Sequence, residues 1–323
     1  MENTLVKVQG LTKHFALDNG AFNSKHEFVH AVDNVSFEVQ RKETFALVGE
    51  SGCGKSTLGR LLIRLINATT GSITFNGNDI SKLKGSALRQ IRKEMQIIFQ
   101  DPFSSLNPRM NIRDIIAEPL LTHKIIKKSE KESYIGQLME LVGLRKEYMS
   151  RYPHMFSGGQ RQRIGIARAI ALNPKFIVCD EPVSALDVSI QSQIINLLQD
   201  LQEEKDLTYL FISHDLGVVR YISSRVCVMF LGKIMELGPT EELYTHPLHP
   251  YTKFLIAAAP IMNPHDRDKE KLILQGDIPS PVNVPSGCRF HFRCPYCKKI
   301  CTEEEPQLIE KDGRSVACHF PGK

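Results

Sequence analysis

The sequence lacks any hydrophobic run long enough to cross a membrane. Its longest apolar stretch near the C-terminus, Phe254 to Met262, contains Pro260 and reaches only about half of the roughly 20 residues that a spanning helix needs. The opening residues Met1-Glu2-Asn3 do not begin a secretory signal, which would combine a basic segment with an apolar one. We therefore expect a cytosolic protein, or one that associates with a membrane only through a partner.

A strong excess of charge of one sign is also missing, because the 323 residues carry a net charge of only +5. The basic segment Lys124 to Lys128 is followed by Glu130 and Glu132, which is typical of a solvated helical face rather than of a nucleic-acid patch. No heptad run indicates a coiled coil. The length and a hydrophobic content of 42% instead fit one large α/β domain with a smaller appendage.

Disulfide bonds are not expected either, because the eight cysteines of a cytosolic chain stay reduced. Three of them, Cys53, Cys179 and Cys227, are scattered along the chain. The last two of these lie in apolar runs, where a buried thiol acts as a small hydrophobic side chain. The other five crowd between Cys288 and Cys318, and this placement requires a separate explanation.

Short apolar runs alternate with helical patterns along most of the chain, which predicts a largely parallel sheet with helices on both faces. We expect strands at Leu5–Val8, Val32–Val39, Phe45–Val48, Gly71–Phe75, Met95–Phe99, Lys175–Cys179 and Thr208–Ser213. We expect helices at Leu58–Ile66, Ala87–Lys93, Arg161–Leu172 and Val188–Glu204. We further expect a polar loop at Asp18–Glu27 and a helical insertion at Asp101–Tyr152. Prolines interrupt every long element after Gly238, which predicts an extension that is not part of the core.

The segment Gly49 to Thr57 matches the phosphate-binding pattern G-x-x-x-x-G-K-[ST], between a predicted strand and a predicted helix. Glycines let such a backbone wrap around a polyphosphate, and the helix N-terminus adds the positive end of its dipole. We expect Lys55 to reach the β- and γ-phosphates and the Ser56 hydroxyl to bind Mg²⁺. The predicted nucleotide contacts in this loop are Gly49, Glu50, Ser51, Gly52, Cys53, Gly54, Lys55, Ser56 and Thr57.

Polar residues follow three further predicted strands. Asp180 is placed to hold Mg²⁺, directly or through water, and Glu181 is suited to accept a proton from a water that attacks the γ-phosphate. Gln100 is expected to reach both Mg²⁺ and the attacking water. His214 is expected to contact the γ-phosphate, although a lone histidine is more often structural. Together with the phosphate-binding loop, these residues predict a site that hydrolyses ATP.

The segment Phe156-Ser157-Gly158-Gly159-Gln160-Arg161-Gln162-Arg163 narrows the class of protein. Together with the phosphate-binding loop, Gln100, Phe176–Glu181, Ser184–Asp187 and His214, it resembles the nucleotide-binding domain of ABC transporters, with Phe156 where leucine is commoner. In that family this signature completes the ATP site of an opposing subunit, so that two domains sandwich ATP head to tail. The resemblance adds Phe15, expected against adenine, and Ser157, Gly158, Gly159, Gln160 and Asp187 to the predicted nucleotide contacts.

The resemblance also implies a fold and its boundaries. We expect a P-loop NTPase core of the ABC type with a mostly parallel sheet, an N-terminal antiparallel β subdomain, an inserted helical subdomain and a small cysteine-rich extension. The ATPase domain is expected at residues 1–240, with the helical subdomain inserted at about 101–159. The extension is expected at residues 241–323.

Five further segments make the resemblance more specific and extend it over essentially the whole chain. They are similar to the ATPases of peptide importers and comprise Gln100–Arg109, Tyr152–His154, Asp180–Ile190, His246–Thr252 and Pro279–Pro295. Gln160 and the segment after it, up to Arg168, together with the long early loop, are similar to the F-type subunit of oligopeptide and dipeptide transporters. The D-type subunit usually carries methionine at the position of Gln160.

The tail reads Cys288-x5-Cys294-x2-Cys297-x3-Cys301-x16-Cys318. Four thiolates can hold zinc or an iron–sulfur cluster, so the spacing leaves both open, and reduced cysteines in a small packed subdomain are a third interpretation. In the resembling subunits a [4Fe-4S] cluster is implied for the positions of Cys288, Cys294, Cys301 and Cys318. Cys297 is extra here and could replace one of them.

The resemblance implies an ATPase that energises peptide uptake from the cytoplasmic side of the membrane as a peripheral subunit. Its expected partners are two transmembrane permease subunits, a second ABC ATPase that is a D-type paralogue or a second copy, and indirectly an extracytoplasmic peptide-binding protein, with no nucleic acid. The alternatives are an importer of nickel or another small solute, an exporter, or a soluble ABC protein that acts on ribosomes or DNA. The last usually carries two cassettes or a coiled coil, and this chain has one cassette and no heptad run.

Overall fold

The computed structural model describes residues 3–17, 27–127, 129–258 and 279–323, and the chain forms two compact units. The first unit combines Met1–Lys82 with Ile212–Lys323, and the second is Leu83–Phe211. Most of the predicted polar loop, residues 18–26, lies outside the described ranges. Within those ranges, no helix has both the length and the apolar character that a membrane span requires. The domain boundaries predicted from the sequence stay a prediction.

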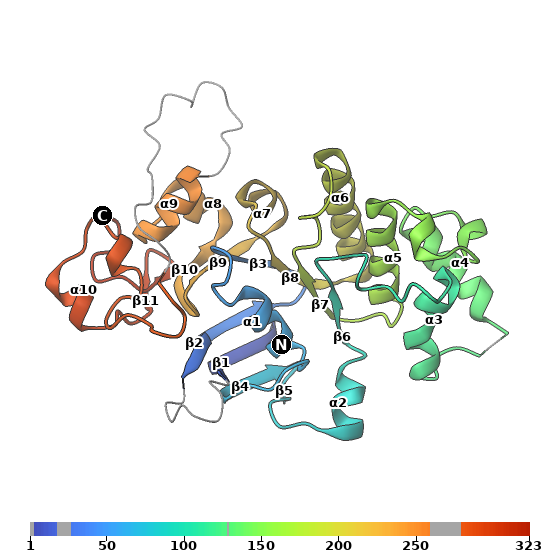
Figure 1. Cartoon of the computed structure of the whole chain (residues 1–323), viewed down its shortest axis with the longest axis horizontal. Helices are drawn as coiled ribbons and strands as arrows, with labels where there is room; N and C mark the ends of the chain where they lie inside the picture. Colours follow the sequence, from blue (N-terminus) through green and yellow to red (C-terminus); the bar gives the residue numbers. More distant parts are fainter. Residues whose placement is uncertain (1–2, 18–26, 128, 259–278) are drawn as a thin grey trace. The chain divides into compact units, whose positions relative to one another are not determined.

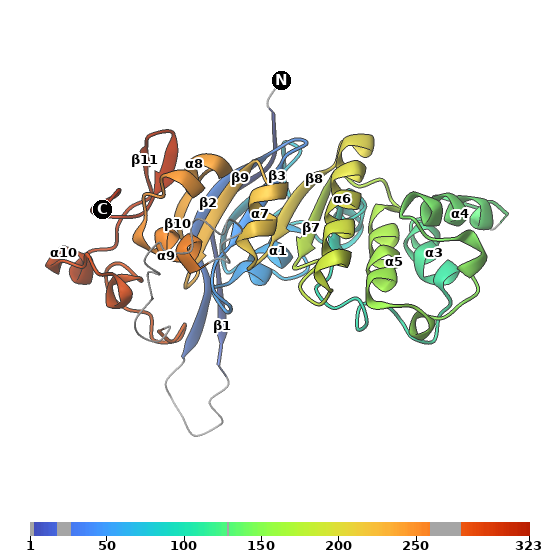
Figure 2. The same cartoon turned by 90° about the horizontal axis from the view of Figure 1, so that it is seen from above.

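An antiparallel sheet with the strand order β2-β1-β4-β5 forms one part of the first unit. Its strands are β1 (Thr4–Ala16), β2 (Phe28–Gln40), β4 (Thr70–Phe75) and β5 (Asn78–Asp79). The strands β1 and β2 run side by side over a greater length than the sequence predicted, as Figure 2 shows. Their pairing shifts register between Val8 and Leu11 and again near Lys13, which obscures the alternating pattern from which strands are predicted.

The first unit also contains the strand order β11-β12-β10-β9-β3. These strands are β3 (Thr44–Val48), β9 (Arg225–Phe230), β10 (Lys233–Pro239), β11 (Ile309–Lys311) and β12 (Arg314–Val316). Every residue of β3 is buried, and β3 pairs parallel with β9. The helices of this unit are α1 (Lys55–Leu62), α7 (Leu216–Ile222), α8 (Thr240–Thr245), α9 (Pro250–Ala258) and α10 (Lys299–Glu303), shown in Figure 1.

One expectation about the C-terminal extension is wrong. The segment after Gly238 was expected to lie apart from the core, but β12 pairs antiparallel with β10 and adds two strands to its sheet. An edge strand leaves backbone N–H and C=O groups unpaired, and β12 satisfies those of β10. The strands β11 and β12 are only three residues long each, so their pattern is too short to be detected in the sequence.

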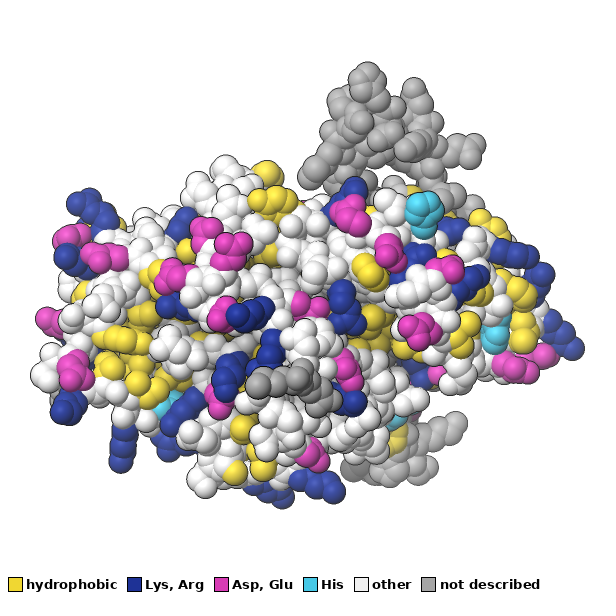
Figure 3. Space-filling view, turned by 180° about the vertical axis from the view of Figure 1, so that it is seen from behind, with side chains coloured by type: hydrophobic (Ala, Val, Ile, Leu, Met, Phe, Trp, Pro, Cys, Tyr) yellow, Lys and Arg dark blue, Asp and Glu magenta, His cyan; other side chains and the backbone are white. Residues whose placement is uncertain are grey.

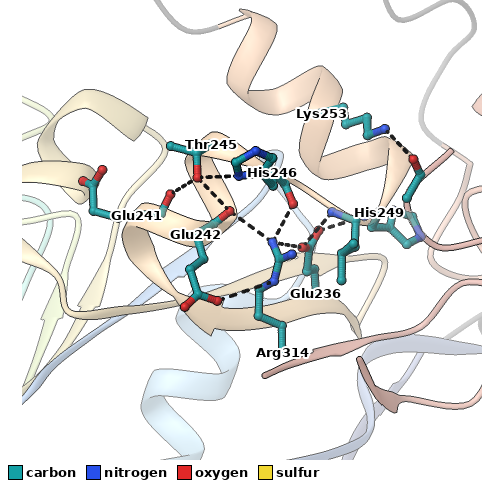
Figure 4. A network of polar contacts seen from close by, with 10 residues as sticks. Glu236, Glu241, Glu242, Thr245, His246, His249, Lys253 and Arg314 are labelled. Atoms are coloured by element: carbon teal, nitrogen blue, oxygen red, sulfur yellow. Dashed lines mark hydrogen bonds and ion pairs between the residues drawn. The ribbon is translucent and has the colours of Figure 1, made fainter. Parts of the chain in front are cut away.

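A buried ion pair anchors the extension to β10 (Figure 4). The Glu236 carboxylate is fully buried and accepts from the backbone N–H groups of Leu248 and His249, both at 2.9 Å. The Arg314 guanidinium lies 3.6 Å from that carboxylate and donates to the carbonyl oxygen of His246 at 2.6 Å. Because each buried charge has several partners, these contacts fix β12 and the start of α9 on β10.

The second unit contains the strand order β8-β7-β6, with β6 and β7 parallel. Its strands are β6 (Met95–Ile98), β7 (Phe176–Asp180) and β8 (Thr208–Ile212), whose last residue belongs to the first unit. Its helices are α2 (Gly85–Ile91), α3 (Ile112–Thr122), α4 (Lys131–Leu141), α5 (Gly158–Ile170) and α6 (Val188–Lys205). The helices α3, α4 and α5 pack together (Figure 1), and α3 and α4 lie within the range in which the sequence predicted a helical insertion.

Positive and negative side chains alternate on the face of the molecule shown in Figure 3. Neither sign forms a continuous patch among the described residues of that face. This distribution agrees with the small net charge of the chain.

Candidate active site

The phosphate-binding loop joins β3 to α1 in the first unit, and its path requires glycine at two points. Gly54 has a φ of 104°, and a Cβ there would lie 1.9 Å from the backbone oxygen of Ala31. Gly49 has a φ of 149°, and a Cβ there would lie 2.2 Å from the backbone oxygen of Met229. Backbone atoms cannot move aside as a flexible side chain can, so no other residue fits at either position.

The ammonium group of Lys55 is directed back over the loop. Its Nζ donates to the carbonyl oxygen of Gly49 at 2.7 Å and to that of Glu50 at 2.9 Å. These acceptors are neutral, and a phosphate would compete for the same protons through stronger, charge-assisted hydrogen bonds. Ser56 and Thr57 follow in the first turn of α1, where backbone N–H groups favour an anion, and no acidic residue occupies that turn.

Two more predicted nucleotide contacts belong to the first unit. The ring of Phe15 is 39% exposed, and Lys13 Nζ lies 4.8 Å from its centroid. His214 directly follows β8 and is exposed, while the Asp215 side chain caps α7 by accepting from two backbone N–H groups. The cap fixes the turn in which His214 lies. The expected contacts of Phe15 with adenine and of His214 with the γ-phosphate stay predictions.

The second unit brings two predicted catalytic residues together. Gln100 Nε2 donates to Glu181 Oε2 at 2.8 Å, which orients the carboxylate. Glu181 has a φ of 47°, a left-handed conformation that costs a residue other than glycine roughly 1–3 kcal/mol. Two hydrogen bonds from Ser184 to the Glu181 carbonyl oxygen hold this turn. Asp180 is only 2% exposed at the end of β7, where the sequence predicted a ligand of Mg²⁺.

The signature segment begins α5, and its polar residues form a reciprocal cap. Ser157 Oγ accepts from the backbone N–H of Gln160 at 3.3 Å, and Gln160 Oε1 accepts from the backbone N–H of Ser157 at 3.1 Å. A Cβ at Gly159 would lie 2.5 Å from Cγ2 of Ile190 on α6, so this glycine is a packing requirement. The cap leaves Ser157 exposed at a helix N-terminus, which is the position expected for contact with a phosphate from outside the chain.

Asp187 is the N-terminal capping residue of α6 and is exposed, as a residue at a dimer interface would be in a single chain. The turn that precedes Asp187 is stabilised by a side chain of α6. Gln191 Nε2 donates to the carbonyl oxygens of Val183 at 3.1 Å and Leu186 at 3.0 Å. These hydrogen bonds order the segment between α6 and the two acidic residues Asp180 and Glu181.

Four of the five clustered cysteines line one small apolar cavity of about 20 Å³ in the first unit, and they are Cys288, Cys294, Cys301 and Cys318. Cys297 does not line it and is exposed. Burial raises the pKa of the Cys288 thiol to about 12 and that of Cys294 to about 11, and repulsion from neighbouring thiolates adds to both shifts. Four thiols around one cavity are a donor set of the number and kind that a metal centre uses, provided that binding of the metal displaces their protons.

Sequence reasoning missed two side chains that contact the phosphate-binding loop. Arg293 forms an ion pair with the Glu50 carboxylate, and the Tyr251 hydroxyl accepts from the Glu50 backbone N–H. The partners are separated by 243 and 201 residues, and no local pattern predicts such pairs. The sequence offered one indication of such a contact, which was the position of Arg293 among the clustered cysteines.

A phosphate-binding loop, a signature helix and a strand-end acid pair in this chain order define an ATPase of the ATP-binding cassette class. A family model described as ABC transporter matches residues 32–184, and one described as the C-terminal region of oligopeptide/dipeptide transporters matches residues 235–301. The chain belongs to the ABC transporter ATP-binding proteins of the oligopeptide/dipeptide family, with which it shares ATP binding and hydrolysis.

Relatives match over almost the whole chain. The oligopeptide transport ATP-binding protein AppF of Bacillus subtilis is 53% identical over 322 residues, covering 99% of this chain and 98% of the relative. The di/tripeptide transport ATP-binding protein DppF of Pseudomonas aeruginosa is 48% identical over 316 residues, covering 98% and 97%. These matches confirm the family resemblance seen in the sequence.

Solved structures confirm the fold. A post-hydrolysis dimer of the ATP-binding cassette MJ0796, bound to ADP and Pi, is 27% identical with a TM-score of 0.65, covering 73% of this chain and 99% of that one. The structure of cbiO1 from Clostridium perfringens, described as part of the ABC transporter complex cbiONQ, is 25% identical with a TM-score of 0.64, covering 75% of this chain and 91% of that one. Both are similar to the cassette part of this chain.

Proposed function

We propose that this chain is the ATP-hydrolysing subunit that energises uptake of oligopeptides or dipeptides across the cytoplasmic membrane. The observation that carries the proposal is the union, in one chain, of the cassette with an extension of the oligopeptide/dipeptide transporter type at residues 235–301. ATP bound at Lys55 of one cassette contacts Ser157 of the other only when the two close together, so binding favours the closed dimer. Hydrolysis removes that contact and lets the dimer open.

The proposed site uses each predicted residue in a separate role. Lys55 and the loop N–H groups bind the phosphates, while Ser56, Gln100 and Asp180 hold Mg²⁺. Glu181 takes the proton of the attacking water, and the hydrogen bond from Gln100 supports its orientation. The neutral amide donor leaves the carboxylate charge intact, which a general base needs.

The proposed partners are two transmembrane permease subunits, a D-type ATPase paralogue and, indirectly, an extracytoplasmic peptide-binding protein. The chain would then lie at the cytoplasmic side of the membrane. A groove of about 440 Å³ in the helical part of the second unit offers a docking surface for a permease segment. Its lining residues include Arg109, Asn111, Asp114, Glu118, Lys131 and Tyr152. The mixed charges of this groove suit a polar segment of a partner rather than lipid.

The uptake proposal is tested in cells that carry the transporter and depend on an external peptide as their source of an amino acid. Lys55→Ala is expected to reduce uptake of a labelled tripeptide to background, because the phosphates lose their principal cation. Lys253→Ala is the control, because Lys253 Nζ donates to the carbonyl oxygens of Gly322 and Lys323 at the end of the described chain. Peptide uptake that continues with Lys55→Ala at normal expression would contradict the proposal. Permease subunits should co-purify with both variants.

We further propose that Cys288, Cys294, Cys301 and Cys318, which line one cavity, hold a metal centre, and that this centre is the iron–sulfur cluster that the resemblance implies rather than a single zinc ion. Protein purified without oxygen is expected to contain about four irons per chain and to absorb broadly near 400 nm. Cys294→Ser is expected to lose most of the iron, and the matched change Cys297→Ser to retain it. Colourless wild-type protein with neither iron nor zinc would refute a metal centre, and one zinc per chain would refute the cluster.

A further inference from the structure

Two side chains of the C-terminal extension hold Glu50, the second residue of the phosphate-binding loop. The Arg293 guanidinium donates two parallel hydrogen bonds to the Glu50 carboxylate, from Nη1 to Oε2 at 2.6 Å and from Nη2 to Oε1 at 3.0 Å. The hydroxyl of Tyr251 accepts from the Glu50 backbone N–H at 2.9 Å. The Arg293 side chain is only 6% exposed and Tyr251 is fully buried, so both contacts are shielded from water.

Glu50 is also part of the internal bonding of the loop. Its carbonyl oxygen accepts from Lys55 Nζ at 2.9 Å and from the backbone N–H of Cys53 at 3.3 Å. One residue therefore links the extension to the lysine that binds phosphate. A displacement of Glu50 moves an acceptor of Lys55 and changes the shape of the loop around the nucleotide.

The ion pair also cancels a negative charge beside the nucleotide. Without a partner, the Glu50 carboxylate would lie in a loop whose N–H groups bind a polyphosphate, and like charges repel strongly where water is excluded. The planar guanidinium of Arg293 matches the carboxylate with two parallel hydrogen bonds. Arg293 thus both positions the loop and keeps it attractive to an anion.

A short turn bracketed by two of the cavity-lining cysteines carries Arg293. The turn, His291–Arg293, begins with a hydrogen bond from His291 N–H to the carbonyl oxygen of Cys288 at 3.0 Å. It ends with one from Cys294 N–H to the carbonyl oxygen of His291 at 3.3 Å. The position of Arg293 therefore depends on the order of the cysteine-lined cavity.

We propose that the extension clamps the phosphate-binding loop, and that Arg293 couples the cysteine-lined cavity to the affinity for ATP. An ordered cavity keeps Arg293 on Glu50 and supports the loop in the shape that binds phosphate. When the cavity loses its thiols or a group bound by them, the clamp loosens and ATP binds more weakly. This inference rests on the proposed function in one respect, since the loop must bind ATP.

The clamp is tested by titrating a fluorescent ATP analogue into the full chain at low ionic strength. Arg293→Gln is expected to weaken binding about tenfold, because it leaves the Glu50 carboxylate unpaired. Adding Glu50→Gln to Arg293→Gln should restore most of the lost affinity, because it removes the unpaired negative charge beside the nucleotide. A rescue of this kind does not result from simple misfolding. Wild-type affinity in Arg293→Gln, or weaker binding in the double variant than in Arg293→Gln, would overturn the clamp.

Two further variants complete the experiment. One is a control that should not affect ATP binding, and the other tests the clamp without changing Arg293. Arg220→Gln breaks an exposed ion pair with Glu241 in the same unit and should bind normally. Tyr251→Phe removes only the hydroxyl that contacts Glu50 and should weaken binding several-fold, which tests the clamp even if Arg293→Gln fails to fold. If Tyr251→Phe bound the ATP analogue with wild-type affinity, the result would contradict the clamp.

The coupling to the cavity is tested by the same titration. Cys294→Ser should weaken binding of the ATP analogue about as much as Arg293→Gln does. A double variant with both changes should bind little more weakly than Arg293→Gln alone, since both changes act through the contact between Arg293 and Glu50. Cys297→Ser should bind normally. Normal binding in Cys294→Ser would overturn the coupling. If the wild-type chain does not bind the analogue, or Lys55→Ala binds it equally well, the proposed function fails instead.

Discussion

Replacing Glu181 with glutamine is expected to lower ATP turnover by about 10²–10⁴-fold or more while ATP binding survives. The amide has the size of the carboxylate and can still accept a hydrogen bond from Gln100, so the turn after β7 should be preserved. It cannot accept the proton of an attacking water. The strained φ of 47° at this position should be unaffected, because glutamine has the same backbone requirements.

The measurements for this variant are steady-state phosphate release and equilibrium binding of ATP. Glu203→Gln is the matched control, since it makes the same change at an exposed position of α6 and should not alter turnover. The variant should also accumulate with ATP as a closed dimer that elutes earlier in size-exclusion chromatography, because hydrolysis no longer opens it. Near-normal hydrolysis in Glu181→Gln would refute its role as general base.

Replacing Ser157 with arginine is expected to lower turnover by about 10²–10³-fold without weakening ATP binding to the isolated chain. Ser157 is exposed at the start of α5, so a larger side chain fits in the single chain but obstructs a nucleotide presented by an opposing cassette. The lost helix cap costs only about 1 kcal/mol. Asn111→Ala removes a comparable cap from α3, where Asn111 accepts from the Asp114 N–H at 2.9 Å, and should leave hydrolysis unchanged.

Mixing two inactive variants tests whether the site is shared. Each ATP site combines the phosphate-binding loop of one chain with the signature segment of the other. Lys55→Ala inactivates the loop and Ser157→Arg inactivates the signature segment. In a mixed dimer, one of the two sites therefore contains both changes and the other contains neither. If the chain forms active homodimers, a mixture should recover up to about a quarter of the wild-type sites, by random pairing. If it pairs with a D-type paralogue, the same test applies with one variant in each subunit. No recovery in a dimer whose wild-type form is active would contradict a shared site.

The local parts of the site could be predicted from the sequence. The loop between β3 and α1 is recognisable because glycine is forced by backbone contacts at Gly49 and Gly54. The cap at Ser157 and Gln160 spans only one turn of helix, so sequence spacing determines it. The sequence placed Gln100 and Glu181 after two predicted strands, and the structure brings them together because the parallel strands β6 and β7 end at the same edge of the sheet.

The non-local parts could not be predicted. The contact between Arg293 and Glu50 depends on how the extension folds back onto the phosphate-binding loop within the first unit, which no periodicity encodes. The addition of β12 to β10 depends on an unpaired sheet edge rather than on the short strand itself. The extended pairing of β1 with β2 contains register shifts, so the alternation that predicts strands is lost there.

The pairing of β3 with β9 has a consequence for the synthesis of the chain. Thr44 and Ser224, which are hydrogen-bonded at the start of these strands, are separated by 180 residues. At a translation rate of 5–20 residues per second, β3 waits about 10 to 40 s for its partner. During this interval the apolar segment Phe45–Val48 is exposed on the ribosome, whereas the second unit is completed first. The nascent chain should therefore bind a chaperone at β3 until β9 is made.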